Sequence, residues 1–202
     1  MKSYFSSSIL ITSLLCSAPA MAHEVSQAKI VELSLHRIER LVILSRIDAS
    51  FLTEIQSLKL DLIPHSDEVT PAFKVTALQG LAQDGTRRGL ELVMNADGKA
   101  LSQNGLAGSA PNVASAWTDK DAVTLTENSL HYVLDNVATT PSLAPIDANL
   151  TEVNLTHGTN AAGQAVAVAE FKTAAQQPGL RVRVKLDGTW DSAEAVAPSI
   201  TE

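Results

Sequence analysis

Residues 31–42 read VELSLHRIERLV, and residues 126–137 read TENSLHYVLDNV. The two stretches share the glutamate, the Ser-Leu-His triplet and the final valine at identical spacing, with an offset of 95 residues. In the first stretch the apolar side chains recur at i, i+4, i+7 and i+11, the spacing of one stripe along an amphipathic helix: Val31, Leu35, Ile38 and Val42. The match therefore predicts two related helices, one in each half of the chain.

Local signals place the ends of these helices. We expect the first helix to run from about Ser26 to Arg46, since no proline interrupts that segment. For the second helix, Thr124 followed three residues later by Glu127 has the pattern of a capping box. Pro141 prevents this helix from continuing.

After each helix the apolar period changes from 3.6 to 2, which is typical of half-buried strands. Three alternating segments follow the first helix and three follow the second: residues 58–62, 73–77, 90–94, 150–155, 166–171 and 180–186. Asp97-Gly98 and Asp187-Gly188 are turn dipeptides at the end of the third segment in each half, and residues 99–101 are expected to resume the earlier strand. The sequence predicts an α+β fold of two tandem αβββ repeats, with antiparallel sheets and one helix per repeat packed on one face.

The first residues resemble a secretory signal. Lys2 is the only charge before residue 24, residues 9–15 are apolar, and Ala20-Met21-Ala22 is a small-residue cleavage site. We therefore expect a Sec-type signal cleaved near Ala22 and a periplasmic or secreted protein without a transmembrane segment. The predicted segments are a signal peptide at 1–22, a first repeat at 23–102, a linker rich in Gly, Ser, Ala and Asn at 103–121, a second repeat at 122–192 and a frayed tail at 193–202.

Charge and cysteine content exclude several functions. The full chain has a net charge of −7, and removal of the predicted leader removes Lys2 and leaves −8. An acidic protein does not suit nucleic acid or anionic lipid, since both require a basic surface. The lone cysteine, Cys16, lies within the predicted leader, so disulfide and thiol chemistry are not expected. Oligomeric state does not follow from the sequence.

The predicted αβββ unit resembles a PepSY-type repeat. The residues that carry the resemblance are the capped helix at 124–137, the middle strand at 73–78 and the last strand at 90–101 with its Asp-Gly-Lys-Ala-Leu ending. Two tandem copies are also similar to the β-lactamase-inhibitor-like proteins. The resemblance implies a non-enzymatic protein that binds or inhibits another protein of the cell envelope, and it supplies no catalytic residues.

Two Glu-x-x-x-His pairs are the main candidate for chemistry. Glu32 with His36, and Glu127 with His131, each place a carboxylate and an imidazole on one helical face. If the two helices meet, two glutamates and two histidines can converge on a divalent metal such as zinc. The alternative is that each pair is an ordinary surface contact beside the apolar stripe.

His23 is a second metal candidate, because it is the expected first residue of the mature chain. A free amino group and an adjacent imidazole form a chelating pair that suits copper. The alternative is that His23 only follows the cleavage site.

No catalytic motif is present: the chain has no Gly-x-Ser-x-Gly elbow, no His-Glu-x-x-His and no glycine-rich phosphate loop. The alternating cations Arg181, Arg183 and Lys185 can contact an acidic partner or form a solvated sheet face. We therefore predict a non-enzymatic, cofactor-free binding or inhibitory module acting on another envelope protein. The alternative function is a periplasmic protein that binds zinc or copper.

Overall fold

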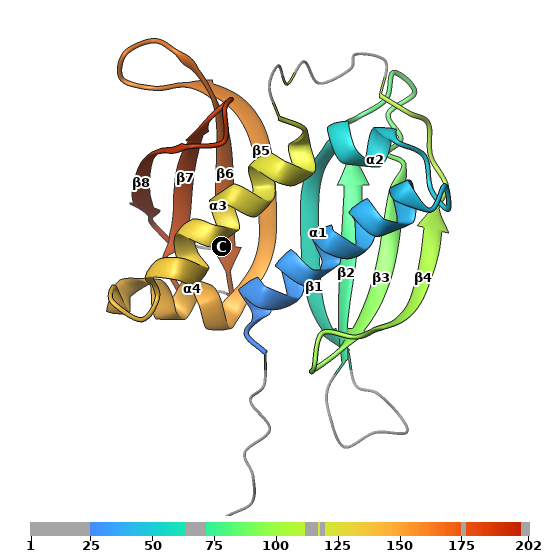
Figure 1. The fold of residues 1–202 in the computed structure, drawn as a ribbon, viewed down its shortest axis with the longest axis horizontal. Helices are drawn as coiled ribbons and strands as arrows, with labels where there is room; N and C mark the ends of the chain where they lie inside the picture. The colour runs from blue at the N-terminus through green and yellow to red at the C-terminus, as the bar shows by residue number, and fades with distance from the viewer. Residues whose placement is uncertain (1–24, 64–71, 112–116, 118–119, 175–176, 199–202) are drawn as a thin grey trace, which may run out of the picture.

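The computed structural model describes residues 25–63, 72–111, 117, 120–174 and 177–198 (Figure 1). The predicted leader, His23 and part of the predicted linker lie outside these residues. The elements are α1 (Gln27–Ile43), α2 (Ser50–Thr53), β1 (Ile55–Ile63), β2 (Ala72–Gln79), β3 (Gly89–Asn95), β4 (Ala100–Leu106), α3 (Ala122–Asn136), the 3₁₀ turn η1 (Pro141–Leu143), α4 (Ala144–Asn149), β5 (Leu150–Thr159), β6 (Ala165–Thr173), β7 (Gly179–Lys185) and β8 (Trp190–Val196).

The first predicted helix start is confirmed and the second is wrong. Ser26 caps α1, because its hydroxyl oxygen accepts a hydrogen bond from the Lys29 backbone N–H. Helix α3 instead begins one turn earlier than the Thr124 capping box, with Asp121 as its cap accepting from the Thr124 N–H at 2.8 Å. An aspartate before the helix accepts hydrogen bonds from free backbone N–H groups of the first turn, which is the role that the predicted capping box would have.

The prediction of two tandem αβββ repeats is wrong, although the α+β class holds. The described strands form one antiparallel eight-stranded sheet in the order β4-β3-β2-β1-β5-β6-β7-β8. The first strands of the two halves, β1 and β5, join at the centre, where Leu58 lies opposite Val153. Within the described residues, each half also contributes four strands rather than three. The strands of the two halves therefore belong to a single continuous sheet.

The missed strands, β4 and β8, are the two edges of this sheet. Gly98 and Gly188 adopt positive φ at the Asp-Gly turns, and each turn reverses the chain so that the next residues pair back onto the preceding strand. The chain after each turn thus starts a new strand instead of resuming the old one. Residues 101–105 of β4 are all exposed, so this strand lacks the alternation of buried and exposed side chains by which a strand is recognised.

Helices α1 and α3 lie side by side on one face of the sheet (Figure 1). Their apolar stripes and the inward side chains of the strands form one buried cluster that spans both halves. Near the middle of each helix a buried serine, Ser34 or Ser129, donates to the carbonyl four residues earlier at 2.8 Å. The opposite sheet face carries polar side chains. This arrangement brings the outer surfaces of α1 and α3 together above the centre of the sheet.

Candidate functional site

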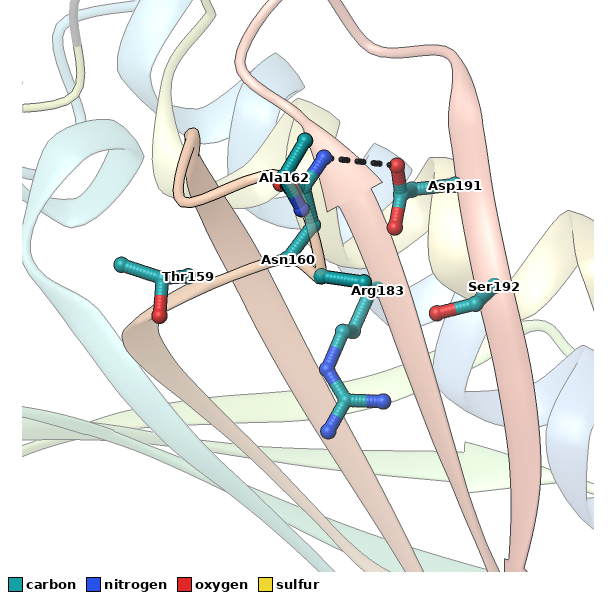
Figure 2. A pocket seen from close by; sticks show the side chains of 7 residues that line it. Thr159, Asn160, Ala162, Arg183, Asp191 and Ser192 are labelled. Carbon is teal, nitrogen blue, oxygen red and sulfur yellow. Dashed lines mark hydrogen bonds between the residues drawn. The ribbon is translucent and has the colours of Figure 1, made fainter.

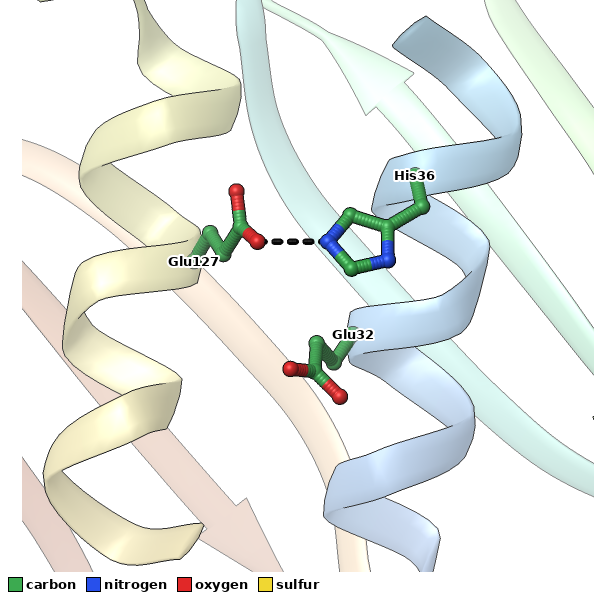
Figure 3. Close-up of side chains that lie close together, drawn as sticks. All are labelled: Glu32, His36 and Glu127. Atoms are coloured by element: carbon green, nitrogen blue, oxygen red, sulfur yellow. Dashed lines mark hydrogen bonds and ion pairs between the residues drawn. The ribbon is translucent and has the colours of Figure 1, made fainter. Parts of the chain in front are cut away.

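The four residues of the two Glu-x-x-x-His pairs meet where α1 and α3 cross. The helices run in opposite directions (Figure 1), so the glutamate of each lies next to the histidine of the other, as Figure 3 shows for Glu127 and His36. His36 Nε2 lies 2.5 Å from Glu127 Oε1, and His131 Nε2 lies 3.0 Å from Glu32 Oε1. We call these four side chains the cross-helix cluster.

Three of the four side chains offer donor atoms to a common point. One atom each from Glu32, His36 and Glu127 lies within 4.8 Å of the others. His131 Nε2 is also 3.9 Å from Glu127 Oε1, in addition to its contact with Glu32. In a tetrahedral zinc site with bonds of about 2.0–2.2 Å, the donor atoms are about 3.4 Å apart. The donor atoms of Glu32, His36 and Glu127 are separated by up to 4.8 Å, and His36 and Glu127 by only 2.5 Å, so these side chains would rearrange on binding zinc.

Glu32 is the buried member of the cluster, with 6% of its side chain exposed. Burial opposes its charged form, but hydrogen bonds and charge from Lys29 and His131 outweigh burial and lower the pKa of Glu32 below its ordinary value. Lys29 pairs with Oε2, and Oε1 points to His131. The carboxylate is therefore ionised at neutral pH, as a metal ligand must be.

Glu39 also interacts electrostatically with the cluster. Burial raises the pKa of Glu39, and the negative charges of Glu127 and Asp121 raise it further, with His36 opposing them. The Glu127 carboxylate thus acts on Glu39 as well as on the two histidines.

The sequence identified the cluster members but not their partners. It paired Glu32 with His36 and Glu127 with His131 along each helix, whereas the shorter contacts run between the helices. It also missed Lys29, although its spacing of three residues from Glu32 is a standard helical ion-pair signal. The copper hypothesis concerned His23, which lies outside the described residues.

Two of the three cations on the basic strand are paired with carboxylates within the sheet. Arg181 donates to Glu170 and to Glu194, and Arg183 donates to Glu194 at 3.0 Å. Figure 2 shows Arg183 beside a hollow of about 650 Å³ between the β5–β6 turn and β8, where Asn160 donates to Asp191 at 2.9 Å. Both charged residues that line this hollow, Arg183 and Asp191, already have protein partners, so it offers a ligand little unpaired charge.

Comparison with known proteins leaves the family open. No family model matches the chain, and no curated protein matches it. Among solved structures, it is similar to the C-terminal domain of YpeB from Bacillus megaterium, with a TM-score of 0.25 and 12% sequence identity over 82% of this chain and 65% of that chain. The chain thus spans just under two thirds of that structure. The resemblance to PepSY repeats stays a prediction.

No helix among the described residues combines the length and apolar character needed to cross a membrane.

Proposed function

We propose that this protein is a non-catalytic zinc-binding protein of the bacterial periplasm, with the cross-helix cluster as its metal site. The observation that supports the proposal is that donor atoms of Glu32, His36 and Glu127, from two helices far apart in sequence, lie within 4.8 Å of one another, with His131 in contact with both glutamates. Two imidazoles and two carboxylates form a donor set that suits zinc. Bound metal would join α1 to α3 and so stabilise the contact between the halves.

The test is a titration of the chain from residue 23 onward, freed of metal by dialysis against a chelator. We expect zinc to bind with a stoichiometry of one by calorimetry and to raise Tm, because a ligand that binds only the folded state stabilises it. His36→Ala/His131→Ala must abolish both effects. His157→Ala is the matched control, because His157 stacks on Trp117 away from the cluster.

Two results would count against the zinc site: no bound zinc, or equal affinity in wild type and the double variant. Copper requires a separate experiment. His23→Ala removes the predicted amino-terminal chelate and leaves the cluster intact, so a loss of copper binding in this variant alone would assign copper to His23.

We also propose that the protein binds an envelope partner by strand addition at β4. The observation that favours this is the composition of the edge strand, ALSQNGL, which is exposed along most of its length and has no charged residue. The opposite edge, β8, carries Asp191 and Glu194. An uncharged edge is a template for pairing with an extended segment of another chain, whereas charges discourage it.

Two lysines placed on the edge strand test this second function. Ser102→Lys/Asn104→Lys should remove a cross-linked partner that wild type captures in the periplasm, because charged side chains obstruct strand addition. Ser192→Lys on β8 is the control and should retain the partner. The same partner captured by all three proteins would refute binding at β4.

A further inference from the structure

A hollow of about 320 Å³ lies between α1 and the turn that joins β3 to β4. Arg37, Arg40 and Lys99 are the permanently charged residues of its lining, and His36 also lines it. The adjacent Asp97 does not line it; its carboxylate accepts a hydrogen bond from Asn95. A cationic hollow is unexpected in a chain with a net charge of −7. The protein groups that pair with its cations show how far the protein itself neutralises them.

The cations of this hollow have few protein partners. Among the described residues, no carboxylate forms a salt bridge with Arg37, Arg40 or Lys99, in contrast to Arg181 and Arg183 on the open sheet face. Arg37 donates from Nη2 to Gln103 Oε1 at 2.9 Å, but its Nε is buried without a hydrogen-bond partner. A buried donor without a partner costs free energy, which would be recovered if the Arg37 side chain turned this N–H toward a ligand acceptor in the hollow.

Each half has a corner where its long helix meets a hairpin turn, and the hollow occupies the corner of the first half. The corresponding corner of the second half, between α3 and the turn that joins β7 to β8, is filled. Its turn reads Asp-Gly-Thr-Trp where the first reads Asp-Gly-Lys-Ala, so Trp190 stands in the place of Ala100. The Trp190 ring packs edge-on against Tyr132, with centroids 5.5 Å apart, and its Nε1 donates to the Asn128 carbonyl at 2.7 Å. Tyr132 stands in turn where α1 has Arg37. The first corner is thus open and cationic where the second is closed and aromatic.

We infer that the hollow binds the oxyanion group, carboxylate or phosphate, of a small molecule. Its volume is in the range of small-ligand sites. Arginine recognises both oxyanions through paired N–H groups, and Lys99 adds a point charge. His36 is shared with the cross-helix cluster, but the inference does not depend on a bound metal, because Arg37, Arg40 and Lys99 supply the charge.

The test titrates metal-free protein with inorganic phosphate and, separately, with succinate at low ionic strength. Binding is followed by the amide shifts of Gly98, Lys99 and Ala100 in NMR spectra. We expect saturable shifts with at least one probe, and weakening with added salt. The probe that binds more tightly identifies phosphate or carboxylate as the preferred group.

Two variants remove the site in different ways. Arg40→Gln/Lys99→Gln should weaken binding by about tenfold or more, the effect of losing a hydrogen bond to a charged group. Ala100→Trp should abolish binding without changing any charge, because it fills the hollow as Trp190 fills the other corner.

Three controls separate the possible outcomes. Arg46→Gln makes the same charge change at an exposed position outside the hollow and should bind like wild type. Trp190→Ala opens the other corner without adding cations and should gain no binding. His131→Ala removes a zinc ligand but does not line the hollow, so it should still bind the anion. No saturable shift with either probe, or equal binding in wild type and both site variants, would overturn the inference.

Discussion

The two corners where a helix meets the hairpin turn of its own half share one backbone design and differ in their side chains. A Cβ on Gly98 would come within 2.2 Å of Leu33 Cδ1, and a Cβ on Gly188 within 2.6 Å of Asn128 Nδ2. Leu33 and Asn128 stand 95 residues apart, the same offset as the two Ser-Leu-His triplets. In both halves a glycine thus lets the turn approach the helix.

The side chains around this shared contact differ in kind. The first corner has Arg37, Lys99 and a small Ala100, while the second has Tyr132 and Trp190. The buried pairs Leu35 with Leu130 and Ser34 with Ser129 are identical in the two halves, whereas the positions that face the turn differ. Packing constrains the residue types at the buried positions. The positions that face the turn are free of this constraint, so they can differ in what they bind.

The largest expected effect comes from the matched core leucines. Leu35 and Leu130 are both fully buried, so Leu35→Ala and Leu130→Ala should each reduce the free energy of unfolding by about 2–5 kcal/mol. Because one core spans both halves, each variant should shift a single urea transition. Leu62→Ala, at a side chain 61% exposed, is the control and should change little. Two separate transitions would show that the halves unfold independently.

A smaller effect is expected at the turn glycines. Gly98→Ala and Gly188→Ala introduce a side chain at positive φ, which costs about 1–2 kcal/mol, and also force a neighbouring side chain to move. Gly163→Ala is the matched control, because Gly163 has φ 75° and no heavy atom within 4 Å of its added Cβ. We expect the urea midpoint to fall further for Gly98→Ala and Gly188→Ala than for Gly163→Ala. Equal shifts would mean that the close approach carries no cost.

The sequence predicted the features that are encoded locally. Its periodicity marked the apolar stripe containing Leu35 and Ile38, and its spacing placed the Glu and His residues on one surface of each helix. The contact between Glu32 and His131 depends on how the helices cross, which no local pattern specifies.

The sheet was mispredicted for related physical reasons. The short pairing around Leu58 and Val153 that joins the halves leaves no local signal. Strand β4 is exposed on both faces, so its composition resembles that of a linker. The empty corner beside Ala100 became recognisable only when the structure placed Trp190 in the equivalent corner.

A still smaller effect is expected at Lys29, whose counterpart 95 residues later is Thr124. The pKa of Glu32 is lowered, so its pairing stabilises the fold above its ordinary value of 4.5, and this stability is lost as the pH falls through the lower folded-state pKa. Lys29→Thr should raise the pKa of Glu32 and reduce stability at pH 7 by less than about 1 kcal/mol. NMR titration of the Glu32 carboxyl carbon measures the shift. Lys59→Thr is the control, and an unchanged Glu32 pKa in Lys29→Thr would contradict the assigned cause.

The smallest effect is expected on the open sheet face, where the halves also differ. In the second half Arg183 and Arg181 lower the pKa of Glu194, while in the first half Lys74 and Asp61 lie 3.7 Å apart. These groups are partly exposed, so salt screens them and their contribution to stability is slight. Glu194→Gln should lower the urea midpoint at low ionic strength and leave it unchanged in 1 M salt, whereas Lys74→Gln should have no measurable effect in either. A salt-independent loss in Glu194→Gln would instead assign Glu194 a packing role, because screening removes charge interactions but not contacts.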